Sequence, residues 1–158
     1  MAITRHAERR AVPYGPKQMF DLVADVSRYP EFLPWCQAAR VRKRDGNVEL
    51  ADLAIGFGPF HETFTSQIVL SPDNAAGPSI ETTGTEGPFR LLTSHWIFHP
   101  DANGPNANGT MIEFALEFDF RSRLLQHTVR VLFAEAVKRM VSAFEARAAQ
   151  LYGRPSGG

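Results

Sequence analysis

The chain has 158 residues, of which 44% are hydrophobic, 11% aromatic and 22% charged. This length supports one globular core and is short for two, so we expect one domain over residues 1–153 and a flexible tail over 154–158. Seventeen Lys and Arg residues balance seventeen Asp and Glu residues. A net charge of zero argues against a protein that binds nucleic acid through its overall charge.

The charges are distributed unevenly along the chain. Residues 1–44 carry nine basic and four acidic side chains, residues 45–120 carry one and eleven, and residues 121–158 carry seven and two. Both ends are therefore basic and the middle is acidic. This division predicts peripheral contact of a basic surface with anionic lipid, and pairing of the charges across the fold is the alternative.

Cysteine content and apolar runs indicate the compartment. Cys36 is the only cysteine, which excludes an intrachain disulfide and a CxxC motif. The first fifteen residues contain no apolar stretch of the kind found in secretory signals, and no apolar run approaches the ~20 residues of a membrane span. We expect a cytoplasmic protein that is peripheral to the inner membrane.

The first 36 residues predict a strand, a helix and an irregular segment. Residues 3–12 are expected to form a strand that ends at Pro13. Apolar residues at helical spacing over 17–26 predict a short helix, with Pro16 suited to its first turn. Residues 29–36 are rich in aromatic residues and prolines, which predicts an irregular segment held by packing.

Between residues 37 and 120 the apolar period is two, which predicts antiparallel strands joined by short turns. In the last strand, residues 110–120, apolar even positions alternate with mostly acidic odd ones, so Glu113, Glu117 and Asp119 are expected to face solvent. The apolar parity changes near Asp52, which predicts a bulge there. Gly56 to Pro59 predicts a hairpin turn rather than a phosphate loop, because strand patterns flank it.

The period returns to 3.6 after Ser122, and this pattern predicts one long amphipathic helix that ends at Gly153. Its apolar stripe comprises Leu125, Val129, Leu132 or Phe133, Ala136, Met140, Phe144, Ala148 and Leu151. The fold class is therefore α+β, with a curved antiparallel sheet wrapped around a long C-terminal helix. One helix rarely fills such a concavity with side chains, so we expect an apolar cavity between the two layers.

Catalytic and metal-binding patterns are absent from the sequence. His95 and His99 lie on a predicted strand, where four residues span roughly 13 Å, too far to share one ion. Cys36 is expected to be a small buried residue with an unactivated thiol. Few polar side chains beyond Thr93 and His95 are candidates for the interior. We therefore expect no catalytic activity, no bound metal and no cofactor.

Several short motifs, taken together, resemble those of the coenzyme Q-binding protein family within the polyketide-cyclase/START-like superfamily. They cover about residues 3–153 and appear in the family's order. The motifs are Val23-Ala24-Asp25-Val26 with Tyr29, Glu31-Phe32, Pro34-Trp35-Cys36, Ile55-Gly56-Phe57, Gly87-Pro88-Phe89, Trp96 with Phe98, Phe118-Asp119-Phe120-Arg121-Ser122 and Ala143-Phe144-Glu145.

This resemblance implies a helix-grip fold of the START/Bet v 1-like type and non-enzymatic binding of ubiquinone in support of respiratory electron transport. The chain also resembles a related branch, the ribosome-association toxins, which lack a tryptophan at the position of Trp35. Binding to a ribosomal subunit is therefore the alternative function. We expect Pro34 and Trp35 to border the mouth of an apolar tunnel, although a filled core is the competing interpretation. The expected lining residues are Phe57, Phe64, Trp96, Phe118, Val129, Phe133, Met140 and Phe144.

Overall fold

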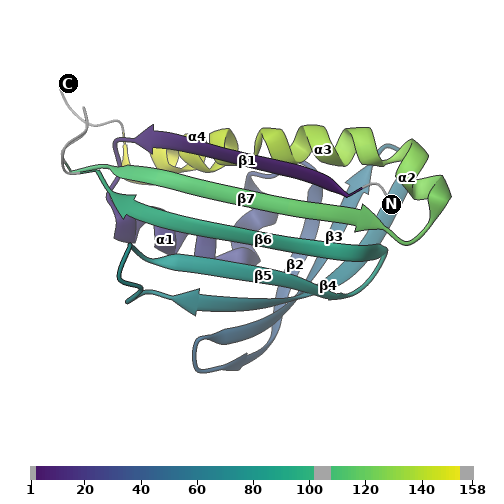
Figure 1. The fold of residues 1–158 in the computed structure, drawn as a ribbon, viewed down its shortest axis with the longest axis horizontal. Coiled ribbons are helices and arrows are strands. Elements are labelled where there is room, and N and C mark those ends of the chain that lie inside the picture. The colour runs from purple at the N-terminus through teal and green to yellow at the C-terminus, as the bar shows by residue number, and fades with distance from the viewer. Residues whose placement is uncertain (1–2, 102–107, 154–158) are drawn as a thin grey trace.

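The computed structural model describes residues 3–101 and 108–153. The expected tail over 154–158 and most of the turn over 100–109 lie outside this range. One antiparallel sheet has the strand order β1-β7-β6-β5-β4-β3-β2 (Figure 1). The strands are β1 (Thr4–Val12), β2 (Cys36–Asp45), β3 (Val48–Phe57), β4 (Phe60–Ser71), β5 (Ser79–Glu86), β6 (Phe89–Pro100) and β7 (Thr110–Phe120).

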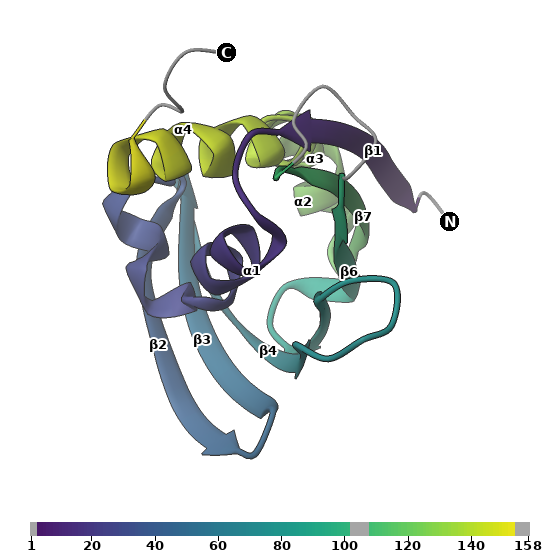
Figure 2. The same ribbon diagram turned by 90° about the vertical axis from the view of Figure 1, so that its left-hand side faces the viewer.

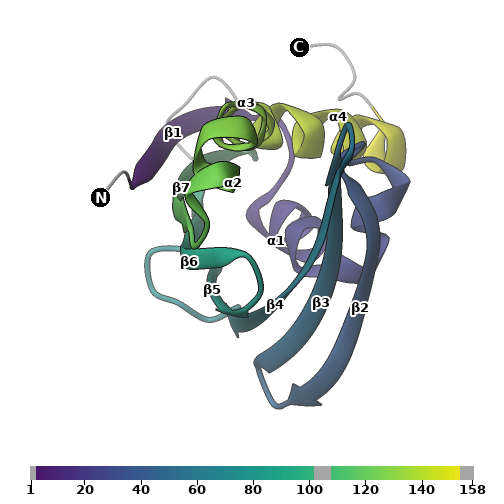
Figure 3. The same ribbon diagram turned by 90° about the vertical axis from the view of Figure 1, so that its right-hand side faces the viewer.

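The sheet is strongly curved, and helices close its concave side. Viewed end-on, strands β2 to β4 face β6 and β7 across the interior, and helix α1 (Pro16–Ala24) lies between them at one end (Figure 2). Helices α3 (Arg130–Lys138) and α4 (Met140–Tyr152) run across the open side, with α2 (Arg123–Thr128) at the other end (Figure 3). This arrangement is the predicted helix-grip fold.

Helix α1 and the 3-10 helix η1 (Val26–Glu31) connect β1 to β2. Pro16 occupies the first turn of α1, and the Gln18 side chain accepts a hydrogen bond from the Gly15 amide at 3.0 Å, which caps the helix. The buried face consists of Met19, Phe20, Leu22 and Val23. The predicted short helix is thus confirmed, and its apolar face covers one end of the interior.

Strand β7 alternates as predicted, with Asp119 as the exception. Glu113 and Glu117 are about 40% exposed, but the Asp119 side chain is 8% exposed. Arg90 Nε donates to Asp119 Oδ2 at 2.7 Å. The register between β6 and β7 shifts between Phe89 and Leu91, so Arg90 is the additional residue of a bulge. The expectation that Asp119 faces solvent was wrong because this ion pair covers its carboxylate.

The bulge predicted near Asp52 lies instead on the neighbouring strand. The β2–β3 register shifts between Cys36 and Ala38 and between Val41 and Lys43, all on β2. Strand β3 keeps a regular alternation, so Glu49 is buried on the same face as Ala51 and Leu53. Arg44 Nε donates to the Glu49 carboxylate at 2.7 Å. The change of apolar parity reflects a buried charged residue rather than a bulge in β3.

The C-terminal segment is three helices rather than the single long helix expected. At the first break, the Thr128 hydroxyl donates to the Leu124 carbonyl at 2.8 Å, a contact that bends helices. At the second break, the Arg139 amide is shared between the carbonyls of Glu135 and Ala136. The helices therefore follow the curve of the sheet, burying Val129, Phe133, Val137, Val141, Phe144 and Ala148. Leu151, expected on the buried stripe, is 51% exposed.

Candidate functional site

A cavity of about 80 Å³ lies between the sheet and the helices α3 and α4. Its wall is mostly aliphatic and aromatic and includes residues from η1, from strands β3 to β7 and from the helices. The lining residues are Val23, Val26, Tyr29, Trp35, Leu53, Phe64, Ser66, Ile68, Ile80, Thr82, Leu92, Ser94, Trp96, Leu116, Phe133 and Met140. The predicted apolar cavity is therefore present, but it is small.

Apart from the Tyr29 phenol, three hydroxyl groups interrupt the apolar wall. They belong to Ser66 on β4, Thr82 on β5 and Ser94 on β6. The polar candidates from the sequence, Thr93 and His95, lie instead on the outer face, where His95 contacts Glu81 at 3.3 Å. Ser94 has the parity of Trp96 and Phe98, so the alternation of β6 contained the signal for its inward position.

A surface groove of about 370 Å³ shares one lining residue, Trp35, with the cavity. Trp35 therefore borders both spaces. The groove passes between the segment before β2, the end of β3 and the junction of α3 with α4. Its lining residues are Leu33, Pro34, Trp35, Gly56, Phe57, Leu132, Glu135, Ala136, Arg139 and Ala143.

The ten residues predicted to form the tunnel fall into three groups. Trp35, Phe64, Trp96, Phe133 and Met140 line the cavity. Pro34 and Phe57 line the groove together with Trp35. Phe118, Val129 and Phe144 lie within the packed core: the rings of Phe118 and Phe133 are 4.6 Å apart, and Phe144 meets Trp96 edge-on at 5.4 Å. The role of all ten as ligand contacts stays a prediction.

The ionisable groups near the cavity are poorly suited to acid–base or nucleophilic chemistry. The Tyr29 hydroxyl donates to the Val23 carbonyl, and burial raises the pKa of this phenol far above its ordinary value. Burial also raises the pKa of the Cys36 thiol to about 11, so the thiolate is scarce at neutral pH. Within residues 3–101 and 108–153, no three His, Cys, Asp or Glu side chains are grouped so that they could hold a metal ion.

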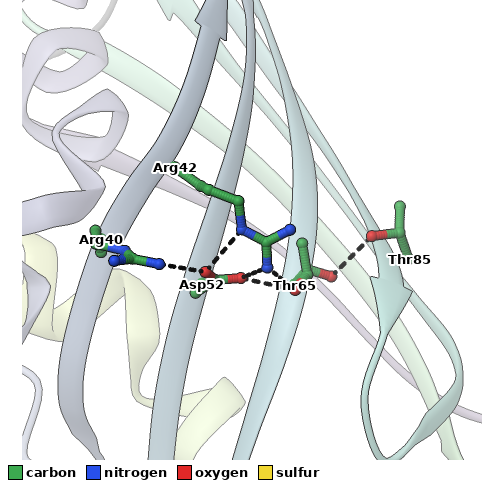
Figure 4. Close-up of polar contacts among 5 residues, drawn as sticks. All are labelled: Arg40, Arg42, Asp52, Thr65 and Thr85. Atoms are coloured by element: carbon green, nitrogen blue, oxygen red, sulfur yellow. Dashed lines mark hydrogen bonds and ion pairs between the residues drawn. The ribbon is translucent and has the colours of Figure 1, made fainter.

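The outer face of the sheet carries a satisfied polar cluster formed by Arg40, Arg42, Asp52, Thr65 and Thr85 (Figure 4). Arg42 donates to both Asp52 oxygens, at 3.0 and 2.6 Å, and the Thr65 hydroxyl donates to Asp52 at 2.7 Å. Hydrogen bonds from Arg42 and Thr65 lower the pKa of the Asp52 carboxyl. The cluster links β2, β3, β4 and β5 and is a structural feature of the sheet.

Comparison with known proteins places this geometry in a family. The model of the family described as "Polyketide cyclase / dehydrase and lipid transport" matches residues 12–145. The chain is 41% identical over 152 residues to the ribosome association toxin RatA of Pseudomonas aeruginosa, covering 96% of this chain and 100% of that protein. It is 35% identical to the mitochondrial coenzyme Q-binding protein COQ10 homolog B of Xenopus laevis, covering 94% and 59%.

Solved structures agree with the fold. An 18 kDa protein from Caulobacter crescentus, known from its solution structure, is 34% identical with a TM-score of 0.69, covering 96% of this chain and 99% of that one. The Zhui aromatase/cyclase of Streptomyces has a TM-score of 0.80 at 14% identity, covering 99% of each chain. At that identity the second likeness concerns the fold alone.

The cavity between a curved sheet and C-terminal helices is thus accompanied by sequence similarity over nearly the whole chain. The resemblance inferred from the motifs is confirmed, since both a coenzyme Q-binding protein and ribosome association toxins are among the relatives. The chain belongs to the polyketide cyclase/dehydrase and lipid transport family.

Proposed function

We propose that the chain binds ubiquinone between its sheet and its C-terminal helices and acts as a non-enzymatic carrier that supports respiratory electron transport. The observation that carries this proposal is an apolar interior and a mostly apolar groove whose linings share one side chain, Trp35. The relative named as a coenzyme Q-binding protein supports the choice of ligand. The cavity lining contains no charged side chain, which suits a neutral apolar ligand.

The sizes of the two spaces require movement at Trp35. Pockets that hold small molecules measure roughly 300–1,000 Å³, whereas the cavity is about 80 Å³ and the groove about 370 Å³. A quinone ring enters only when the two spaces join. Rotation of Trp35, together with small shifts at the Arg139 junction between α3 and α4, is the route that the arrangement offers.

The energetics of a long apolar tail favour reversible exchange with a membrane. Each methylene removed from water contributes ~0.8 kcal/mol, but the bilayer shelters the tail equally well. The free energy of transferring the tail from lipid to protein is therefore close to zero, and the contacts of the quinone ring decide the affinity. A carrier needs such a balance because it must both collect and release its ligand.

Exposed apolar residues on α2 and α3, of which Leu132 also lines the groove, are suited to contact with a membrane. Leu124, Val131 and Leu132 are 69%, 56% and 48% exposed on α2 and α3. Exposed Arg123 and Arg139 lie on the same segment, and each basic residue near an anionic surface contributes ~1 kcal/mol. We infer that this end of the molecule faces the bilayer while quinone passes through the groove. No helix of the described residues is long and apolar enough to cross a membrane.

Mass spectrometry of lipid extracted from the purified protein, together with uptake from quinone-loaded vesicles, tests the ligand. We expect about one ubiquinone per chain after incubation. Absence of quinone from the extract, combined with no uptake, would overturn the proposal.

Two alanine positions allow a matched test of the entry route. Ala136 lines the groove, whereas Ala146 is exposed on α4 and lines neither space. Ala136→Trp is expected to reduce the rate of quinone uptake more than tenfold, and Ala146→Trp to leave it unchanged. Equal rates in both variants would exclude the groove as the entrance.

The membrane contact has its own matched pair. Leu132→Asp is expected to abolish flotation with vesicles that contain anionic lipid. Leu151→Asp, at an exposed apolar position near the other end of the helical layer, is the control. Equal flotation of the two variants would place the contact elsewhere.

Binding to a ribosomal subunit is the second candidate function. It is supported by the relatives named ribosome association toxin and by the basic edge strand β2, where Arg40 is 75% exposed and Lys43 is exposed. If this candidate is correct, the protein co-sediments with isolated ribosomal subunits in moderate salt, with or without quinone. Lys43→Glu should then weaken co-sedimentation, and Lys17→Glu on α1 should not.

A further inference from the structure

The three hydroxyl groups in the cavity wall lie on adjacent strands at neighbouring positions. Thr82 pairs directly with Ser94 across β5 and β6, which places their Cβ atoms about 4.5–5.5 Å apart. Ser66 pairs with Gly84, two residues from Thr82, across β4 and β5. Because each of the three residues lines the cavity, they form one polar patch on an otherwise apolar surface.

Ser66 is the residue that points to a ligand. It is 1% exposed, and among the residues that the structure describes its hydroxyl oxygen has no hydrogen-bond partner. The cross-strand neighbour, Gly84, has no side chain that could provide one. A buried hydroxyl group without a partner is unfavourable, so one that borders an internal space is suited to a polar atom of whatever occupies that space.

The surroundings of the patch restrict the chemistry of that atom. Hydrophobic side chains such as Ile68, Leu92 and Leu116 surround the hydroxyl groups, and none of the lining residues carries a charge. An ionic ligand group would lose its hydration without gaining a counter-charge. A neutral acceptor such as a carbonyl oxygen, which needs only a hydroxyl donor, fits this environment.

We propose that Ser66, Thr82 and Ser94 form a polar subsite that binds a carbonyl oxygen of an otherwise apolar ligand. This inference rests on the proposed function and adds an orientation to it. The quinone ring lies against β4, β5 and β6, and the isoprenoid tail leaves past Trp35 into the groove. The subsite also gives the protein a means of distinguishing a quinone from a hydrocarbon of similar shape, because such a hydrocarbon leaves the hydroxyl groups without a partner.

Equilibrium binding of three probes tests the subsite. Decylubiquinone carries quinone carbonyls, methyl palmitate carries an ester carbonyl, and hexadecane carries none. The variant combines Ser66→Ala, Thr82→Val and Ser94→Ala. The control combines Thr83→Val and Thr93→Val, which alter hydroxyl groups on the outer face of the same two strands, β5 and β6. Thermal unfolding establishes that both proteins fold.

We expect the inner variant to bind decylubiquinone about tenfold more weakly, the effect of losing one or two hydrogen bonds. Hexadecane binding should be unchanged, and the control should behave as the wild type. In infrared spectra, the carbonyl band of quinone bound to the wild type should lie at lower wavenumber than in hexadecane, and Ser66→Ala should reverse part of that shift.

The possible failures are distinguishable. If the wild type binds decylubiquinone and the inner variant binds it equally well with an unchanged carbonyl band, the subsite is wrong and the proposed function stands. If methyl palmitate binds as tightly as the quinone and loses affinity in the inner variant, the carbonyl subsite stands and the quinone assignment is wrong. If the wild type binds none of the probes, both are wrong.

Discussion

Thr65 and Ser66 are consecutive residues of β4, both buried, and they show how the two faces of the sheet differ. The Thr65 hydroxyl donates to Asp52 and accepts from Arg42, so its hydrogen-bonding capacity is used within the protein (Figure 4). The Ser66 hydroxyl has no partner among the described residues and borders the cavity. The Thr65 hydroxyl therefore stabilises the sheet, whereas the Ser66 hydroxyl remains available to a ligand.

The inner face is itself divided. Around Trp96 the wall is closely packed: its ring centroid is 4.2 Å from that of Phe114, and it meets Phe144 edge-on at 5.4 Å. Ser66, Thr82 and Ser94 border the same cavity as Trp96, but they contribute hydroxyl groups rather than an aromatic ring. We therefore expect Trp96 to contribute mainly to stability and the three hydroxyl groups mainly to ligand binding, and mutations can separate the two.

The largest effect is expected for Trp96→Ala. Trp96 is 4% exposed, and loss of a buried tryptophan side chain costs about 3–5 kcal/mol of unfolding free energy. Urea unfolding followed by circular dichroism measures this cost. A loss below about 1 kcal/mol would show that the wall around Trp96 is as loosely packed as the wall around Ser66, Thr82 and Ser94.

Thr65→Val should have the next largest effect. It removes a donor to the Asp52 carboxylate and an acceptor for Arg42 at a buried position, so we expect a loss of about 1–3 kcal/mol in unfolding free energy. The same urea titration measures it, with Thr83→Val as a control on the outer face of β5. An unchanged midpoint for Thr65→Val would mean that water replaces these contacts at no cost.

Asp52→Asn should change the pH dependence of stability. The pKa of Asp52 is lowered in the folded state, chiefly by the hydrogen bond from Arg42. The contribution of ionised Asp52 to stability is therefore fully present above its pKa in the unfolded chain, about 3.9. It is lost as the pH falls through the lower pKa of the folded state. At pH 7 the wild type should unfold at a higher urea concentration than the variant. This difference in midpoint should shrink towards pH 2. A constant difference would assign the effect to shape rather than charge.

The smallest effect on stability is expected for Ser66→Ala, because no hydrogen bond within the described residues is lost. The unfolding free energy should stay within about 0.5 kcal/mol of the wild type or rise, since a buried hydroxyl group without a partner is removed. The same change is expected to weaken quinone binding. A loss of stability comparable to that of Thr65→Val would remove the contrast between the two faces.

Regular alternation in β7 and β6 made the fold predictable from the sequence. Phe114, Leu116 and Phe118 identify the inner face of β7, and Trp96 and Phe98 do so for β6. The same parity assigns Ser94 to the interior and His95 to the outside. The error lay in taking Thr93 and His95 as interior candidates, although both have the parity opposite to that of Trp96.

Other features depend on contacts that no local pattern contains. Asp119 is buried only because a register shift brings Arg90 to it. The helix breaks at Val129 and Arg139 occur without proline or glycine and arise from the curvature that the helices must follow. The size of the cavity depends on how α3 and α4 pack, so the sequence predicted its existence but not that it is about 80 Å³.

The pairing of β1 with β7 has a consequence for how the chain folds. Thr4 lies opposite Phe118 and Val12 opposite Thr110, so β1 is synthesised long before its partner strand. Until β1 pairs with it, that edge of β7 is open. Such distant pairing slows folding and exposes apolar strands to aggregation. We therefore predict that deletion of residues 1–12 yields insoluble protein.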